Sequence, residues 1–385
     1  MKRILLPVAA LLMFSHVVSL AESGNSAAPR LFTPDGKVAR EDFFPIAVWL
    51  QSPRNAERYK AAGINLYVGL WKGPTTEQLA ALEKAGMAVI CDQNETSLKN
   101  LNNPLIAAWM HGDEPDNAQS LPSKKGYGPP ILPEKIIAQF NSQRVADRSR
   151  PVLLNLGQGV AWDNYIGRGV RRNHPEDYAE YVKGSNIVSF DIYPANHDAK
   201  EIAGRLEYVP RGVERLIKWA GPDRTVWNCI ECTGIDNPKG KPTPAQVRSE
   251  VWMSLIKGSR GLIYFVHQFK PGFSEAALLD DKEMLEAVTA LNAQIKELAP
   301  VLNSPTIPGK VASAESIATM VKRHRGHTWL FAANLSDKPV ATTFTLEGDG
   351  QVEVIGESRK AVRQKGAFTE EFAGYAVHLY RMENP

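Results

Sequence analysis

Two glutamates stand just beyond apolar runs that have the composition of buried strands. Glu114 lies shortly after the run 105–111, and Glu231 directly follows the run 225–230. A carboxylic acid that protonates a leaving oxygen and a carboxylate that attacks an anomeric carbon, roughly 5 Å apart, together hydrolyse a glycosidic bond with retention. We therefore expect Glu114 to be the acid/base and Glu231 the nucleophile of such a site.

Each glutamate also has a purely structural interpretation. Glu114 can be a carboxylate at the start of a loop or helix, and Glu231 a solvated residue at a strand end. For Glu231 this interpretation is weak, because a charge between Cys229 and Cys232 in an apolar strand costs free energy unless it is paired or used. The matching positions of the two glutamates favour the chemical interpretation.

The strands that lead to the glutamates belong to a series of strand-then-helix units, the pattern of a parallel sheet. The expected strands cover residues 46–50, 65–71, 87–91, 105–111, 151–156, 187–193, 225–230 and 262–266. The expected helices cover residues 55–62, 75–85, 133–148, 178–183, 213–219, 245–257 and 282–298. Eight such units in about 250 residues predict an α/β fold, a closed (β/α)8 TIM barrel. A doubly wound open sheet is the alternative, but no glycine-rich phosphate fingerprint follows the first strand.

The chain changes character after the expected barrel domain, residues 22–302. Residues 303–308 contain two prolines and form the expected linker. Residues 309–385 contain short alternating runs separated by turn residues, which predict a small antiparallel β-sandwich domain. The clearest runs are 328–333, 341–346, 351–355 and 375–380. Since no aromatic stripe marks a sugar platform there, we expect this domain to cover one side of the barrel.

The loops at the carboxyl ends of the strands build the active site of a TIM barrel, and several polar or aromatic side chains fall there. Sugar hydroxyls need hydrogen bonds, and the C–H faces of a sugar need flat rings. Asp191 and Tyr193 share a face of the sixth strand at its two-residue period. The expected substrate-binding residues are Asp113, Tyr193, Asp191, Trp71, Lys72, Gln93, Asn155, Gln158, His267 and Gln268.

Some of these residues have competing structural explanations. Asp191 can be a buried ion-pair partner, Tyr193 an aromatic residue at a strand end, and His267 a satisfied core histidine. Trp162 can line a subsite or anchor helix packing.

The sequence around both glutamates resembles a known group of enzymes, the clan A glycoside hydrolases. The segment 108–115 (AWMHGDEP) is similar to their fourth-strand acid/base motif, and the segment 226–231 (VWNCIE) to their seventh-strand nucleophile. The layout, a barrel with an appended sandwich, is similar to that of bacterial β-galactosidases and endo-β-1,3-glucanases. The resemblance implies that Tyr193 hydrogen-bonds the nucleophile.

Two positions depart from the clan pattern. Asp113 stands where clan members usually have the asparagine that binds the sugar 2-hydroxyl. The negative charge of Asp113 should raise the pKa of Glu114, which suits a general acid. The eighth strand ends in Val266-His267-Gln268-Phe269, where these families commonly have a tryptophan. These two departures affect which sugar is bound, and they leave the two-carboxylate mechanism unchanged.

The amino terminus predicts export. Basic residues, an apolar run and the sequence Ser19-Leu20-Ala21 make up a signal peptide over residues 1–21, cleaved after Ala21, so we expect a secreted or periplasmic protein without a membrane span. Loss of Lys2 and Arg3 with this peptide lowers the formal net charge from +3 to +1. Such a charge does not favour nucleic acid as a partner.

The remaining composition indicates neither a disulfide framework nor a cofactor. The three cysteines are too few for such a framework, and Cys229 and Cys232 lie on opposite faces of an expected strand, so we expect buried free thiols. We expect no metal site, because no cluster of His, Asp and Glu has ligand spacing, and no serine lies in a nucleophile elbow.

The sequence therefore predicts a retaining glycoside hydrolase that cleaves a β-linked oligosaccharide or polysaccharide with two glutamates and without a cofactor. Two alternatives stay open. One is an inverting hydrolase on the same barrel, whose carboxyls would be about 6.5 to 9.5 Å apart. The other is a catalytically inactive carbohydrate-binding protein.

Overall fold

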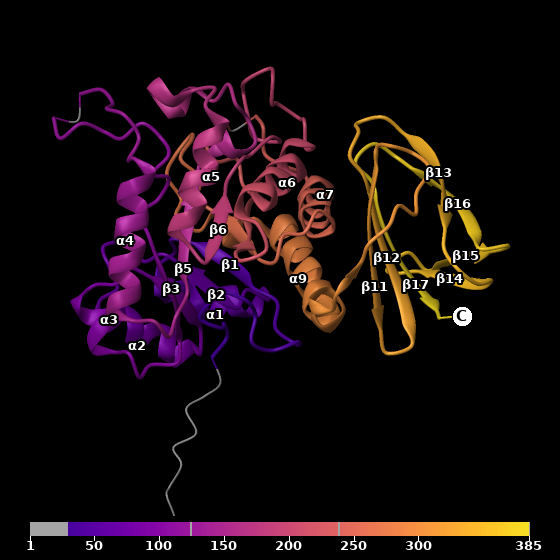
Figure 1. The fold of residues 1–385 in the computed structure, drawn as a ribbon, viewed down its shortest axis with the longest axis horizontal. Coiled ribbons are helices and arrows are strands. Elements are labelled where there is room, and N and C mark those ends of the chain that lie inside the picture. The colour runs from indigo at the N-terminus through magenta and orange to yellow at the C-terminus, as the bar shows by residue number, and fades with distance from the viewer. Residues whose placement is uncertain (1–29, 124, 238, 385) are drawn as a thin grey trace, which may run out of the picture.

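The computed structural model describes residues 30–123, 125–237 and 239–384. The signal peptide expected over residues 1–21 lies outside these ranges. Within them, no helix is both long enough and apolar enough to span a bilayer. A helical and a β-rich part of the molecule lie side by side (Figure 1).

The first part is the expected barrel. Its strands are β1 (Ile46–Trp49), β2 (Leu66–Val68), β3 (Ala88–Cys91), β4 (Ile106–Met110), β5 (Val152–Leu156), β6 (Ile187–Phe190), β7 (Thr225–Val226), β8 (Asn228–Glu231) and β9 (Leu262–Phe265). All neighbouring pairs are parallel, and β9 pairs with β1. β7 pairs with β6 and β8 with β9, so β7 and β8 are two parts of the seventh strand, interrupted at Trp227. With them counted as one strand, the barrel closes and the predicted (β/α)8 fold is confirmed.

The helices that follow the strands agree with the sequence pattern in place more than in length. They are α1 (Ala56–Ala61), α2 (Thr76–Ala85), α3 (Glu95–Lys99), α4 (Pro133–Ala146), α5 (Tyr178–Tyr181), α6 (Tyr208–Ala220), α7 (Pro244–Ile256), α8 (Ala277–Asp280) and α9 (Lys282–Asn303). Short 3-10 turns lie at Pro53–Asn55, Gln158–Val160, Ile166–Arg171, Pro175–Asp177 and Val182–Gly184. α2 begins at the expected capping box of Thr75 and Gln78 and ends at Gly86, whose φ is 59°. α6 begins earlier than expected because Pro210 lies in its first turn, where a missing N–H breaks no helical hydrogen bond.

Alternate residues of the barrel strands enter two separate cores. Ala47, Leu66 and Ile263 belong to the cluster inside the barrel, while Ile46 and Val48 pack outward against the helices. This period of two fixes which side chains at the carboxyl ends of the strands point into the barrel mouth.

The second part is the expected antiparallel sandwich. Its strands are β10 (Thr306–Ile307), β11 (Ile317–His324), β12 (His327–Asn334), β13 (Val340–Thr345), β14 (Gly350–Val354), β15 (Arg359–Arg363), β16 (Ala367–Phe372) and β17 (Val377–Glu383). One sheet has the order β10-β11-β12-β17-β14-β15, and β13 pairs with β16. β10 falls within the stretch 303–308 and pairs with β11, so this stretch is joined to the sheet.

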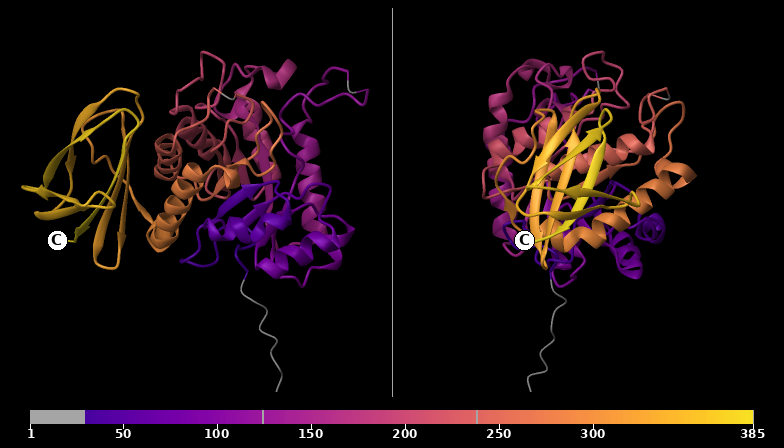
Figure 2. Two further views of the ribbon diagram at one scale, coloured as in Figure 1. Left: turned by 180° about the vertical axis from the view of Figure 1, so that it is seen from behind. Right: turned by 90° about the vertical axis from the view of Figure 1, so that its right-hand side faces the viewer.

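The sandwich packs against α7 and α9 of the barrel (Figures 1 and 2). The Trp252 ring of α7 stacks on the Phe331 ring of β12 at 5.5 Å between centroids. Arg248 Nη1 donates to the Val377 carbonyl at 3.0 Å, and Ser249 Oγ to the Tyr375 carbonyl at 2.7 Å. Apolar stacking and polar contacts thus join the two domains.

Candidate active site

Three carboxyls gather at the carboxyl ends of β4 and β6. Asp113 and Glu114 follow β4 in the chain, and Asp191 directly follows β6. The carboxyls of Glu114 and Asp191 lie within hydrogen-bonding reach of each other. We call Asp113, Glu114 and Asp191 the acid cluster. It unites the expected acid/base with two of the expected substrate-binding residues.

Glu114 is held in an uncommon backbone conformation. Its φ is 42°, in the left-handed region that residues other than glycine, asparagine and aspartate rarely occupy. Asn117 Nδ2 donates to Glu114 Oε2 at 2.8 Å. A Cβ on Gly157 would lie 2.9 Å from Glu114 Oε1, so only glycine leaves room beside this carboxyl. A strained backbone combined with tight lateral contacts is typical of a functional group held in position.

A hydrogen-bonded chain links the acid cluster across three adjacent strands. Asn155 of β5 donates from Nδ2 to Asp113 Oδ1 at 2.9 Å. Ser189 of β6 donates from Oγ to Asn155 Oδ1 at 2.7 Å. Asn155, expected to bind substrate, thus orients Asp113.

The environment of the acid cluster raises all three pKa values. Burial, followed by the negative charges of Asp191 and Asp113, raises the pKa of Glu114 well above its usual value. Burial raises the pKa of Asp191 to about 7 and that of Asp113 to about 6. Asp113 is nevertheless an exposed residue, so solvent screens its charge more than those of Glu114 and Asp191. At neutral pH, Glu114 therefore holds a proton that it donates toward Asp191, and such a pair titrates as a unit.

Buried polar atoms without hydrogen-bond partners also collect here. Among the described residues, Asn117 Oδ1 is buried and unpaired, and the buried Asp191 Oδ1 and Tyr193 Oη have no partner beyond this group, since Asp191 lies within hydrogen-bonding reach of Tyr193 and Glu114. Buried polar atoms are normally paired, and each exception needs an explanation. The unpaired oxygen of Asn117 therefore stands beside a buried group of acceptors that suits a ligand rich in hydroxyl groups.

Glu231 lies in a different environment. Its side chain is fully buried at the end of β8. Its Oε1 accepts from the backbone N–H of Ala195 and its Oε2 from that of Asn196, both at 2.7 Å. Its carboxyl contact is with Glu250 of α7, and burial raises its pKa to about 8. Within the described residues, no hydrogen bond joins Glu231 to Glu114; a retaining pair about 5 Å apart would have none, so the assignment of Glu231 as nucleophile stays a prediction.

Tyr193 and Gln158 lie on the β5–β6 side of the mouth. Tyr193, expected to hydrogen-bond the nucleophile, adjoins Asp191, and its ring packs on Phe265 with 5.2 Å between centroids. Gln158 Oε1 lies 3.1 Å from His197 Nε2. These side chains extend the wall beside the acid cluster.

The expected residues after β9 and β2 lie elsewhere on the rim. The His267 ring stacks on Phe269 with 6.1 Å between centroids, and its Nε2 is 3.2 Å from Gln51 Nε2. Gln268 exchanges backbone hydrogen bonds with Ser274 across a short bridge. Trp71 is exposed, and Lys72 follows it with a φ of 54°.

Gln93 turns away from the mouth. Its Nε2 donates to the Gln143 carbonyl of α4 at 3.1 Å, so its side chain ties a strand end to a helix.

Asn117, Tyr165 and His197 were missed by sequence reasoning. Asn117 donates a hydrogen bond to Glu114. Burial, together with the negative charges of Glu114 and Asp191, raises the pKa of Tyr165. The His197 ring contacts Trp162 with 5.4 Å between ring centroids. All three lie in irregular segments, where no period signals which side chains turn inward. Trp162, which the sequence suggested could line a subsite, was the one pointer to this part of the loop after β5.

The three cysteines are free and buried, as expected. Cys229 Sγ faces Asn155 Oδ1 inside the barrel, whereas Cys232 Sγ approaches the Phe265 carbonyl. In the described ranges, no group of three or more His, Cys, Asp or Glu side chains is arranged to hold a metal ion.

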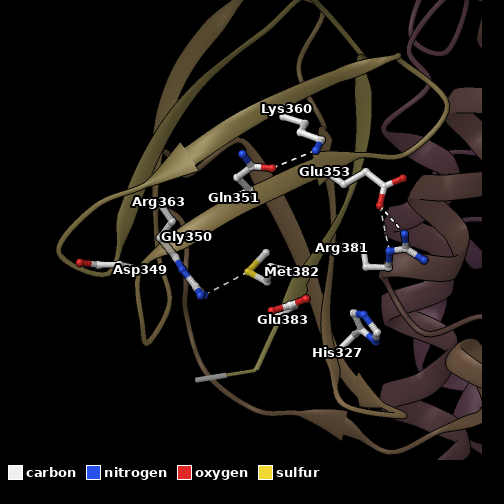
Figure 3. A pocket seen from close by; sticks show the side chains of 10 residues that line it. All are labelled: His327, Asp349, Gly350, Gln351, Glu353, Lys360, Arg363, Arg381, Met382 and Glu383. Carbon is white, nitrogen blue, oxygen red and sulfur yellow. Dashed lines mark hydrogen bonds and ion pairs between the residues drawn. The ribbon is translucent and has the colours of Figure 1, made fainter.

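A polar hollow of about 400 Å³ lies on the sandwich, away from the acid cluster (Figure 3). It contains the ion pair of Arg381 with Glu353 and the hydrogen bond of Lys360 to Gln351, and Arg363 reaches toward Met382 in it. The hollow is built from sandwich strands alone, so it adds nothing to the acid cluster.

Comparison with known proteins supports the fold. The chain matches no family model, and no curated protein matches it in sequence. Among solved structures, AmyP in complex with maltose has a TM-score of 0.53 at 10% identity and covers 90% of this chain and 97% of its own. A putative α-galactosidase from Bacteroides fragilis has a TM-score of 0.51 at 11% identity, covering 89% of this chain and 80% of its own. A β-L-arabinopyranosidase from Geobacillus stearothermophilus in complex with arabinose has a TM-score of 0.50 at 11% identity, covering 89% and 98%.

These structures share the architecture of the chain, and two of them are named as glycosidases. The fold implied by the resemblance to clan A glycoside hydrolases, a barrel followed by a sandwich, is thereby confirmed.

Proposed function

We propose that the chain is a glycoside hydrolase whose reaction takes place at the acid cluster, with Glu114 as proton donor and Asp191 as its partner carboxylate. The observation that carries the proposal is the contact between these two carboxyls, one protonated and one available as a carboxylate near neutral pH. The unpaired buried Asn117 Oδ1 beside it suits a hydroxyl group of a sugar.

The chemistry follows from the two carboxyls. In the first step, an Asp191 oxygen forms a bond to the anomeric carbon, the glycosidic C–O bond breaks, and the Glu114 proton passes to the leaving oxygen. In the second step, Glu114 takes a proton from water, the water oxygen attacks the anomeric carbon, and Asp191 leaves. Asp113, held by Asn155, faces the mouth and can bind a hydroxyl next to the bond that breaks.

The close approach of the carboxyls favours retention of configuration. Inverting enzymes keep their carboxyls about 6.5 to 9.5 Å apart to accommodate a water, whereas retaining enzymes need about 5 Å. Carboxyls within hydrogen-bonding reach are closer than in either class, so a bound sugar must separate them, and the spacing of retaining enzymes requires the smaller separation. The β-linkage in this proposal rests on the resemblance of the segment 108–115 to clan A motifs.

A substrate screen and anomer analysis test the proposal. The screen should contain β-1,3, β-1,4 and β-galactosyl oligosaccharides with α-linked counterparts, and product anomers should be followed by NMR. We expect Glu114→Gln and Asp191→Asn to lose at least about 100-fold in turnover, as expected when an acid or a nucleophile is removed. Asp92→Asn, the same change at the end of β3, is the matched control.

Glu231 as the nucleophile is the competing assignment, and azide distinguishes the two. Azide can replace a missing carboxylate nucleophile, which yields a glycosyl azide of inverted configuration. We expect rescue of Asp191→Ala by azide and none of Glu231→Ala; the reverse pattern would return the nucleophile to Glu231. Saccharide binding without turnover of any substrate would instead indicate a carbohydrate-binding protein.

We also propose export of the protein with cleavage after Ala21, on the basis of the amino-terminal sequence. Amino-terminal sequencing of the exported chain should begin at Glu22. A chain that retains Met1 in the cytoplasm would contradict this.

A further inference from the structure

Two carboxyls meet in the interior beside the barrel, apart from the acid cluster. Glu231 of β8 and Glu250 of α7 are both fully buried, and their side chains lie within hydrogen-bonding reach of each other. Neither Glu250 oxygen has another hydrogen-bond partner among the described residues. No salt bridge found in these residues involves either glutamate.

Glu231 is the acceptor of this pair. Both of its oxygens already receive a backbone N–H, from Ala195 and Asn196 at 2.7 Å each. Two N–H donors favour the ionised form of a carboxyl. The proton that keeps two buried carboxyls from repelling each other therefore resides on Glu250, whose O–H can point only toward Glu231.

The segment that Glu231 holds is continuous with the acid cluster. Ala195 and Asn196 follow Asp191 and Tyr193 by only a few residues. The Asn196 side chain in turn donates to the Gly234 carbonyl, and Asn237 Nδ2 donates to the Asn196 carbonyl at 3.0 Å. The loops after β6 and β8 are thus joined around the Glu231 carboxylate.

We propose that Glu231 is a positioning residue, whose carboxylate, stabilised by a proton on Glu250, fixes the loop after β6 and through it Asp191 and Tyr193. The positioning role rests on the proposed function, whereas the proton on Glu250 does not. The contacts that carry both are the two backbone hydrogen bonds, the complete burial and the absence of a balancing cation in the described ranges.

The pair makes the stability of the folded protein fall as pH becomes alkaline. Burial raises the pKa values of Glu231 and Glu250, and the two carboxyls titrate as a unit. Since the folded state binds the shared proton more tightly than the unfolded state, this stabilisation is complete below about pH 4.5 and is lost as the folded pair gives up that proton at alkaline pH. The other titratable neighbour is the buried Cys232 thiol, beyond which lies the ion pair of Lys241 with Asp281.

Two amide substitutions separate the roles. Glu250→Gln keeps an N–H donor for the Glu231 carboxylate and cannot lose it at high pH. Glu231→Gln places an NH2 group against a backbone N–H, so one donor loses its acceptor. Glu286→Gln, at an exposed position of α9, is the matched control.

The first measurement is the thermal midpoint at about pH 6 and about pH 9. We expect the protein and Glu286→Gln to lose stability between the two pH values, Glu250→Gln to lose less, and Glu231→Gln to be destabilised at both. An identical pH dependence of Glu250→Gln and the unmodified protein would overturn the shared proton. If Glu231→Gln does not fold, Glu250→Gln still decides whether the proton is shared, and kcat of Glu231→Asp, which keeps the carboxylate on a shorter side chain, decides the positioning role.

The second measurement is the pH profile of kcat on a cleaved substrate. We expect Glu250→Gln to retain kcat and to lose the part of the alkaline decline that this proton causes, while Glu231→Gln lowers kcat more than it raises KM. Unchanged kcat in folded Glu231→Gln would overturn the positioning role. A chain that cleaves no saccharide but shows the expected midpoints would contradict the proposed hydrolase and leave the proton on Glu250 standing.

Discussion

At the scale of single residues, the acid cluster is an arrangement of three carboxyls that cannot all be ionised. Asp113 and Asp191 surround Glu114 with negative charge, and burial adds to the effect. The order of the pKa values, with Asp113 near 6 and Asp191 near 7, leaves the proton on Glu114. The charges of Asp113 and Asp191 therefore keep Glu114 protonated, as a general acid must be before it donates its proton.

Asp113→Asn should shift the pH dependence of turnover. Removal of this negative charge lowers the pKa of Glu114, by roughly one unit or less for a neighbouring charge. Because the protonated form of Glu114 is the active one, the alkaline limb of the kcat/KM profile should move to lower pH. Asp92→Asn should leave the limb in place; an alkaline limb that does not move in Asp113→Asn would show that Asp113 is not coupled to the acid.

Gly157→Ala should weaken turnover by displacing Glu114. The added Cβ would lie 2.9 Å from Glu114 Oε1 and 2.7 Å from Asn117 Oδ1, closer than unbonded atoms approach. We expect a loss of about 10- to 100-fold in kcat, the size that misplacement of a catalytic group produces. Gly272→Ala, where a Cβ meets nothing within 4 Å, is the control. Unaffected turnover of folded Gly157→Ala would contradict the placement of Glu114.

At the scale of elements, the seventh strand is divided at Trp227. The indole is fully buried and packs against Phe32, with 5.6 Å between ring centroids. Gly261 lies against the same indole, so the backbone before β9 passes close to it. A segment that precedes β1 thereby seals the barrel end opposite the mouth.

Gly261→Ala should destabilise the barrel without changing its chemistry. The new Cβ would lie 2.4 Å from the Trp227 ring, with no flexible end that could move aside. Overpacking of this kind costs about 1 to 3 kcal/mol. Denaturant unfolding measures the loss, with Gly272→Ala as control; a midpoint equal to that of the control would mean that the ring can shift.

At the scale of the whole molecule, the sandwich is attached firmly rather than tethered. Besides the ring stacking of Trp252 on Phe331, the buried Lys322 of β11 donates to the Leu302 carbonyl at 3.0 Å. Lys322 thus satisfies a carbonyl at the end of α9, where helices leave such groups unpaired. Barrel and sandwich should therefore unfold together.

Phe331→Ala should weaken both domains at once. Truncation of a fully buried phenylalanine costs about 3 to 5 kcal/mol. Differential scanning calorimetry should show one transition at a lower temperature. Val362→Ala, at an exposed position of β15, should leave the midpoint unchanged; two separate transitions in Phe331→Ala would show that the domains fold independently.

The sequence predicted the fold better than the site. Continuous apolar runs located all eight barrel strands, because buried parallel strands are apolar throughout and lie between amphipathic helices. Glu114, Asp191, Asp113 and Asn155 were identified because strand ends face the mouth. The environment of Glu231 was not predictable, because the loop that supplies its two N–H donors has no periodic pattern. Its contact with Glu250 depends on how a helix packs outside the barrel.

The left-handed backbone of Glu114 carries an implication for how this protein could change over generations. Asparagine tolerates a φ of 42° more readily than glutamate does. Glu114→Asn should therefore melt at a higher temperature than the protein itself while losing turnover. Selection for thermal stability alone would favour such a substitution. A glutamate that persists at this position across generations would therefore indicate selection for activity at the expense of stability.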